Sequence, residues 1–150
     1  RCRVVTAISA MPDALNELLT GFVAAIADPA VEVRREVATA LGKTERARDA
    51  VVKTLSYSLS DPDAETRVRA AAALSRFGQA SRSAVPQLSR MVRDSDANVR
   101  RNAVTALDAI GFPSLESVSA IEEATHDADD TVQSAARSAL ARVMKMSAAA

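Results

Sequence analysis

The side chains that most often carry nucleophilic or metal chemistry are scarce in this 150-residue sequence, which has one histidine, His126, and one cysteine, Cys2. A histidine general base needs a nucleophile within hydrogen-bond reach, and a zinc site needs several Cys or His ligands. No Cys-x-x-Cys or His-x-x-x-His pair is present. We therefore expect no catalytic residue, no metal and no cofactor.

Two groups of carboxylates are the nearest approach to a calcium site, but neither is followed by the ligand spacing of an EF-hand loop. The groups are Asp61 with Asp63, and Asp127 with Asp129 and Asp130. Each stands just before an amphipathic stretch, where a carboxylate accepts hydrogen bonds from the free N–H groups of a helix start. The four glycines stand singly, so no phosphate-binding loop is present. We interpret the carboxylates as helix caps.

Aspartate recurs at an interval of 33 residues, and its neighbours recur with it. The aspartates are Asp28, Asp61, Asp94 and Asp127. Six positions later come Arg34, Arg67 and Arg100, with Gln133 in the last copy. Alanine follows at twelve positions and leucine at thirteen in all four copies. A period in this range predicts small units that stack, each burying its apolar face against the next.

Each repeat is expected to be two antiparallel helices joined by a tight acidic turn. In the third copy, apolar residues recur three or four positions apart on both sides of the turn, and Asp96 is placed to cap the second helix. Gly111 is placed to end it. No sustained period-two alternation predicts a strand. The expected helices are 13–27, 31–43, 46–59, 64–77, 81–93, 97–110, 114–126 and 130–144.

We expect a single domain over 1–150, with a partial repeat at 1–10 and a tail at 145–150. RCRVVTAI at the start aligns with RREVATAL one period later, so the first residues resemble the second helix of an earlier repeat. The chain would then be a fragment of a longer array. Hydrophobic residues make up 48% of the sequence but aromatics only 3%, and alanine fills the gap, which favours closely packed helices. The complete repeats are 11–44, 45–77, 78–110 and 111–144.

The stretch DPAVEVRREVATAL at 28–41 resembles a HEAT repeat, with the pattern D-P-x-x-x-V-R-x-x-x-x-x-A-L. The short period is similar to the bacterial HEAT-like repeats of phycobilisome lyases. The resemblance implies an all-α solenoid, a right-handed superhelix of stacked helix pairs, in which the recurring Asp and Arg residues form a structural ladder between repeats. Thr66 in place of Val and Gln133 in place of Arg depart from the pattern.

The resemblance also implies that the second helices line a concave face. A track of small residues flanked by Arg and Asn on these helices would leave a shallow groove for a peptide or helix. An ordinary solvated helix surface explains the same residues, and composition does not separate the two readings. The candidate partner-binding residues are Arg35, Thr39, Arg69, Ala72, Arg76, Arg101, Asn102 and Thr105.

The sequence therefore predicts a non-catalytic scaffold that binds a protein partner, with an acidic or amphipathic segment suiting the mildly basic central repeats. One alternative is a regulatory or chromophore-lyase-like subunit, which would need Cys, His or Tyr clusters. Deoxyhypusine hydroxylase, a HEAT-type enzyme, is built on several His-Glu pairs, whereas this chain has His-Asp once. A nucleic-acid binder would need a basic groove, but the net charge is zero. We expect a cytoplasmic monomer, without nucleic-acid or membrane partners.

Overall fold

The computed structural model describes residues 21–22, 24–44, 49–111 and 113–148, and within these ranges every regular element is a helix. The helices predicted at 1–10 and over most of 13–27, and the start of the one at 46–59, lie outside the described residues. None of the described helices is both long and apolar enough to cross a membrane. The elements are α3 (Val31–Gly42), α4 (Asp49–Ser58), α5 (Ala64–Phe77), the 3-10 helix η2 (Gly78–Ala84), α6 (Val85–Met91), α7 (Ala97–Ile110), α8 (Leu115–Ala124) and α9 (Asp130–Ala148).

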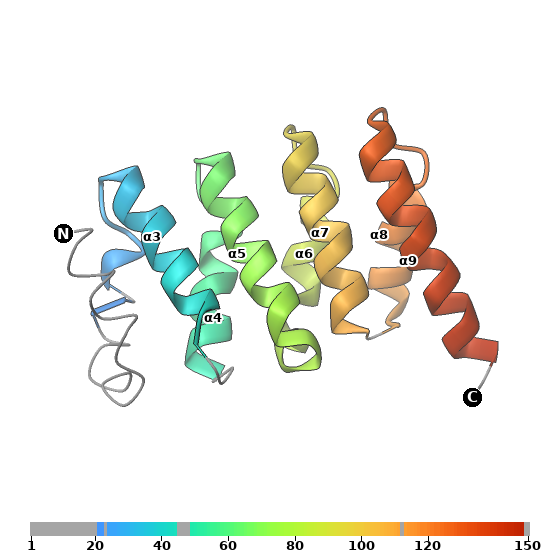
Figure 1. Ribbon diagram of the computed structural model, residues 1–150, viewed down its shortest axis with the longest axis horizontal. Coiled ribbons are helices and arrows are strands. Elements are labelled where there is room, and N and C mark those ends of the chain that lie inside the picture. Colours follow the sequence, from blue (N-terminus) through green and yellow to red (C-terminus); the bar gives the residue numbers. More distant parts are fainter. Residues whose placement is uncertain (1–20, 23, 45–48, 112, 149–150) are drawn as a thin grey trace.

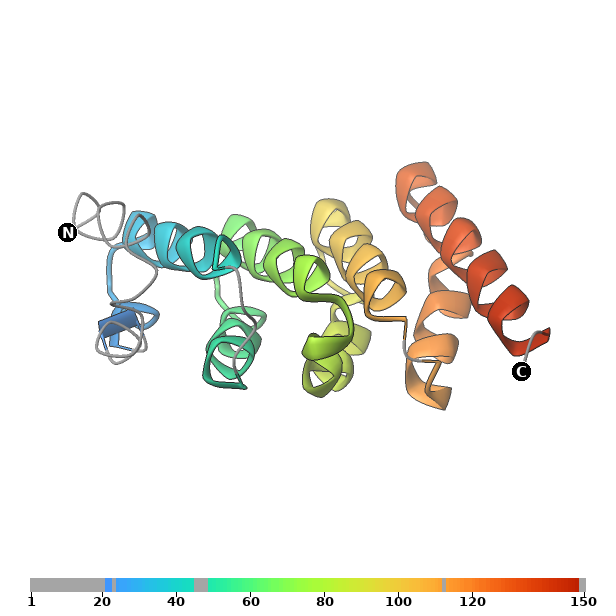
Figure 2. The same ribbon diagram turned by 60° about the horizontal axis from the view of Figure 1, so that its bottom comes forward.

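The helices form two layers along an elongated array. Helices α3, α5, α7 and α9 stand side by side in one row, and α4, α6 and α8 form the second row behind them (Figure 1). The two rows separate clearly when the array is tilted (Figure 2). We call the first row the B helices and the second row the A helices, and the outer surface of the first row the B-helix face. The predicted all-α solenoid of stacked helix pairs is confirmed.

Local signals fix where the B helices begin and end. Asp63 accepts a hydrogen bond from the backbone N–H of Thr66 (2.8 Å), and Asp96 accepts from those of Asn98 (2.8 Å) and Val99 (3.2 Å). A carboxylate in this position satisfies N–H groups that have no partner inside the helix. Gly111 ends α7 with a φ of 61°, a conformation that costs glycine little. Helices α5 and α7 accordingly have the predicted bounds.

The segment between α5 and the next A helix differs from prediction. A continuous helix was expected over 81–93, whereas η2 covers Gly78–Ala84 and α6 only Val85–Met91. Pro86 lies in the first turn of α6, where its missing N–H removes no helical bond. The buried Ser81 hydroxyl donates to the carbonyl of Leu74 (2.9 Å), so the 3-10 turn is tied to the end of α5. The last helix also differs, since α9 extends to Ala148 rather than 144.

Small side chains allow the B helices to pack closely. Ala70, Ala103 and Ala136 are all buried, and Ala106 is 0% exposed. At the joint between α3 and α5, a Cβ atom added to Gly42 would lie only 2.7 Å from the Cβ of Ala73. Interiors of this density leave little room for a larger side chain. The spacing of the B-helix face therefore depends on alanine and glycine.

We predict that Ala106→Leu destabilises the chain more than Asn102→Ala does. The leucine has no free volume between α7 and its neighbours, so the free energy of unfolding should fall by about 1–3 kcal/mol. Asn102 is partly exposed and donates only to the carbonyl of Asn98 within its own helix (2.8 Å), so its replacement should change stability by about 0.5 kcal/mol or less. Urea unfolding followed by circular dichroism measures both, and equal midpoints would contradict the assigned packing.

Candidate functional site

Three arginines tie each acidic turn to the next. Arg34 donates through Nε (2.7 Å) and Nη2 (3.0 Å) to the two carboxylate oxygens of Asp61, 27 residues later. Arg100 does the same to Asp127, with both distances 2.7 Å. Arg67 reaches Asp94 through Nη2 (2.8 Å). All three pairs are mostly buried, and the two-bond contacts of Arg34 and Arg100 with carboxylates are geometrically specific.

Each arginine also holds its own turn. The Nη1 groups of Arg34, Arg67 and Arg100 donate to the backbone carbonyls of Asp28 (2.9 Å), Asp61 (2.8 Å) and Asp94 (2.9 Å), respectively. Each aspartate in turn accepts the backbone N–H two residues ahead, as Asp28 does from Ala30 (2.9 Å). Six of the seven residues predicted to form the ladder thus make three turn-to-turn ion pairs, whereas the bonds given above for Asp28 lie within its own turn.

The ladder changes in its second and last copies. Arg67 makes a single bond to Asp94, and its Nε is buried without a hydrogen-bond partner. A hollow of about 330 Å³ lies beside it, lined in part by Gln87, Arg90 and Met91. In the last repeat Gln133 donates to the carbonyl of Asp127 (2.7 Å). This bond matches the one that each turn arginine makes within its own turn, but the neutral amide forms no ion pair with a further carboxylate.

Two of the predicted partner-binding residues link repeats instead of standing free. Arg35 donates to both carboxylate oxygens of Asp63 (2.9 and 2.6 Å), whose pKa is held below its usual range by Arg35 and then by Thr66. Arg69 donates to Glu65 (2.8 Å) and to the hydroxyl of Thr39 on the neighbouring helix (2.9 Å). Their charges are largely neutralised, so they are weaker candidates for partner contacts than the sequence indicated.

A shallow groove of about 170 Å³ lies on the B-helix face between α3 and α5. It brings together four predicted residues, Thr39, Arg69, Ala72 and Arg76, but not Arg101, Asn102 and Thr105, which lie on α7. Arg76 and Lys43 are exposed, and neither forms an ion pair with any residue that the structure describes. The groove also includes Ala38, Gly42 and Ala73. The sequence did not lead us to Gly42, although a glycine at a helix position expected to be buried indicates a close approach of two helices.

Nothing in the described ranges resembles a catalytic or metal centre. No group of three or more His, Cys, Asp or Glu side chains there could hold a metal ion. His126 is exposed, and its Nδ1 lies 3.0 Å from the hydroxyl of the adjacent Thr125. Cys2 lies outside the described residues.

The model of the family described as HEAT repeats matches residues 19–83 and 52–141. The chain belongs to the HEAT-repeat family. The family assignment agrees with the regular turn aspartates and arginines and with the paired helices (Figure 1). A search of curated proteins finds no matching sequence.

Solved structures share the HEAT-like architecture at low sequence identity. The complex of CpcE and CpcF of phycocyanin lyase from Nostoc sp. PCC7120 aligns over 97% of this chain and 59% of that chain, with 21% identity and a TM-score of 0.75. Human deoxyhypusine hydroxylase aligns over 85% and 43%, with 21% identity and a TM-score of 0.71. A designed armadillo repeat protein in complex with the peptide (KR)4 aligns over 83% and 64%, with 20% identity and a TM-score of 0.64. These likenesses show the fold, and the chain spans about half the length of the two natural proteins.

We predict that the ladder makes the solenoid sensitive to acid. The pKa of Asp127 is lowered, chiefly because Arg100 donates to its carboxylate. A carboxyl whose pKa is lower in the folded state stabilises the fold above its unfolded pKa and loses this contribution as pH falls through the folded pKa. Asp127→Asn should therefore lower the free energy of unfolding by about 1–3 kcal/mol at pH 7. The difference from the unaltered protein should shrink progressively as pH falls below about 4.

Urea midpoints at pH 7, 5, 4 and 3.5 measure this dependence. Asp130→Asn is the control, because Asp130 lies three residues further on at the start of α9, is exposed and forms no ion pair with a described residue. A difference between Asp127→Asn and the unaltered protein that stays constant down to pH 3.5 would contradict the ionic role assigned to this carboxylate.

Proposed function

We propose that this chain is a non-catalytic scaffold module that binds a protein partner along the B-helix face. The observation that carries the proposal is the groove between α3 and α5, because two of its cations, Lys43 and Arg76, are exposed and have no ion-pair partners among the described residues. The turns offer a partner much less, since their charges are used between repeats. Membership of a family built from stacked repeats supports it further, because such arrays present extended surfaces.

The central part of the face carries exposed residues of the kind found in interfaces. Arg101 is exposed on α7, near the small Thr105, and its only described polar side-chain contact is a long one to Asn98 (3.5 Å). Arginine is favoured at binding hot spots, because its planar fork bonds while its stem packs. An acidic or amphipathic segment would suit this surface, and its affinity would weaken as salt rises.

The alternative is a regulatory or chromophore-lyase-like subunit of an enzyme complex. The likeness to the lyase complex of CpcE and CpcF covers nearly all of this chain, which makes the alternative worth testing. At 21% identity this likeness concerns the fold. The identity of the partner separates the two, since a lyase-like subunit would be recovered with a second repeat subunit or a chromophore-carrying protein.

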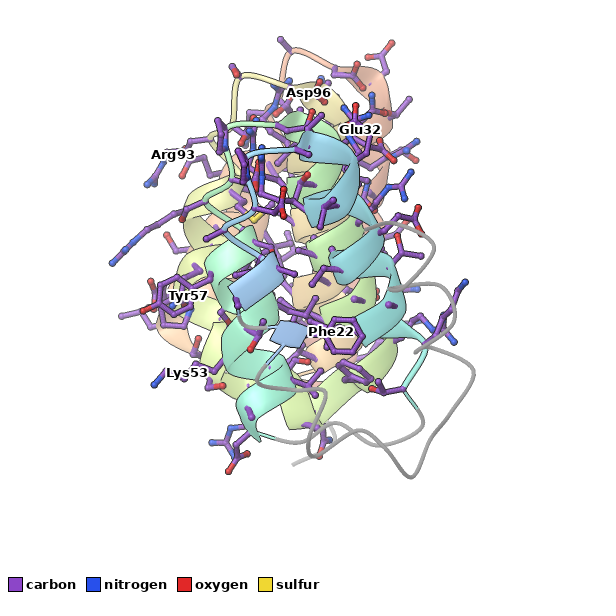
Figure 3. The ribbon with its side chains drawn as sticks, turned by 90° about the vertical axis from the view of Figure 1, so that its left-hand side faces the viewer. Phe22, Glu32, Lys53, Tyr57, Arg93 and Asp96 are labelled. Carbon is purple, nitrogen blue, oxygen red and sulfur yellow. The ribbon has the colours of Figure 1, made fainter. Side chains whose placement is uncertain are left out.

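We expect a photo-crosslinking residue at position 105 to capture a defined partner and the same residue at position 57 to capture none. Thr105 is exposed on the B-helix face. Tyr57 is 71% exposed but projects from α4 on the side of the A helices (Figure 3). The captured protein, identified by mass spectrometry from the source cells, is then purified and titrated. Capture through position 57 alone would contradict the proposal.

With the purified partner, we expect Arg101→Glu to weaken binding by about tenfold or more at low salt, because it reverses an exposed charge in the interface. Arg90→Glu makes the same charge change on α6, in the A layer, and should leave the affinity within about twofold. Circular dichroism confirms that both variants are folded. Arg69 is left unaltered, since its contacts to Thr39 and Glu65 join structural elements.

A further inference from the structure

The side chains that meet at the joint between two adjacent B helices differ from one joint to another, and this difference points to a ligand. At the joint between α7 and α9, Arg142 donates through Nε to Asp108, 34 residues earlier (2.8 Å), and through Nη2 to the other oxygen of the same carboxylate. Two joints towards the N-terminus, between α3 and α5, Arg76 also stands 34 residues after the counterpart of Asp108, which is Gly42. The arginine is present at this joint, but the residue at the position of Asp108 is a glycine, whose side chain is only a hydrogen atom.

The replacement leaves both a charge without a partner and a space. Arg76 is exposed and forms no ion pair with a described residue, and the same holds for Lys43 beside it. Gly42 cannot carry a side chain without moving α5, since its Cβ would lie 2.7 Å from that of Ala73. Gly42 and Ala73 both line the groove of about 170 Å³ that Arg76 and Lys43 also line.

The charge balance of the groove favours an anion. Its lining includes three cations, Lys43, Arg69 and Arg76, and no carboxylate. Arg69 is already compensated by Glu65 (2.8 Å) and by Glu36 (3.5 Å). The carbonyl ends of α3 and α5 attract the other two cations, which holds them near the groove. The donors of the Arg76 guanidinium have no hydrogen-bond partners among the described residues.

We propose that the Arg76 groove, formed by Ala38, Thr39, Gly42, Lys43, Arg69, Ala72, Ala73 and Arg76, binds an aspartate or glutamate side chain of a partner segment. The carboxylate of this side chain takes the place at Arg76 that Asp108 occupies at Arg142, and Lys43 adds a second positive charge. A two-bond contact with a guanidinium selects a planar carboxylate over a neutral amide of the same shape. This assignment rests on the proposed function, and it names the chemistry of the partner and the place where it is anchored.

The test is an NMR titration of the 15N-labelled chain with two blocked peptides. They are Ac-Ala-Ala-Glu-Ala-Ala-NH2 and the same peptide with Gln in place of Glu, which differ only in the charge of one planar group. The signals followed are the backbone N–H groups of Gly42 and Ala73 and the Nε–H of Arg76. The Nε–H of Arg142 is the internal reference, because it already donates a hydrogen bond to Asp108.

We expect the Glu peptide to shift Gly42, Ala73 and Arg76 saturably while Arg142 stays unmoved, and the Gln peptide to bind about tenfold more weakly. Arg76→Gln should weaken the Glu peptide by a similar factor. Arg90→Gln, which removes an exposed cation from α6, should leave its affinity within about twofold. Because Arg76 is exposed, its replacement should leave the remaining spectrum of the folded chain unchanged.

Equal affinity for the two peptides, or a loss of affinity in Arg90→Gln as large as that in Arg76→Gln, would overturn the assignment, since either result means nonspecific attraction. Absence of saturable binding would overturn it as well. These outcomes are separate from the test of the proposed function. A partner captured at position 105 keeps the scaffold proposal even if the peptides fail, whereas capture only at position 57 removes it even if the Glu peptide binds.

Discussion

The contact between one turn arginine and the next turn aspartate is the interaction on which the rest of the solenoid depends. One guanidinium holds the backbone of its own turn and the carboxylate of the following turn, and that carboxylate holds the backbone ahead of it. Every B helix begins within a few residues of such a turn. The contact therefore fixes the register between neighbouring B helices. Because burying ions has a desolvation cost, its main contribution is this alignment rather than a large net stabilisation.

The parts of the fold that sequence could predict are those set by local signals. The bounds of α5 and α7 followed from apolar spacing and from the caps Asp63 and Asp96. Each of these aspartates accepts from backbone N–H groups no more than three residues further along the chain. The division of 78–91 into η2 and α6 was missed, although Pro86 was a visible signal. The bond from Ser81 to Leu74, which ties this segment down, joins two helices and has no signature in helical periodicity.

The candidate site was harder to predict because the state of a cation depends on its neighbour in the next repeat. Arg35 and Arg101 look alike in sequence, yet Arg35 bonds Asp63, 28 residues away, and Arg101 has no such pair in the described part of the chain. Hydrogen-bonded pairs between repeats recur at separations of 27 to 34 residues, so the period indicates where a partner can lie. The offset does not say whether a pair forms, because Asp129 stands 28 residues after Arg101 as Asp63 does after Arg35, yet Arg101 forms no ion pair with it.

The contact between Gly42 and Ala73 bears on how such a chain could evolve by duplication. The residues that correspond to Gly42 in the next two repeats are Ser75 and Asp108, so the three joints do not have the same shape. A joint is a property of two adjacent repeats and is not carried by either one alone. Copying or exchanging a single repeat would create junctions whose surfaces are not matched, so the order of the repeats is constrained by the fit between neighbours.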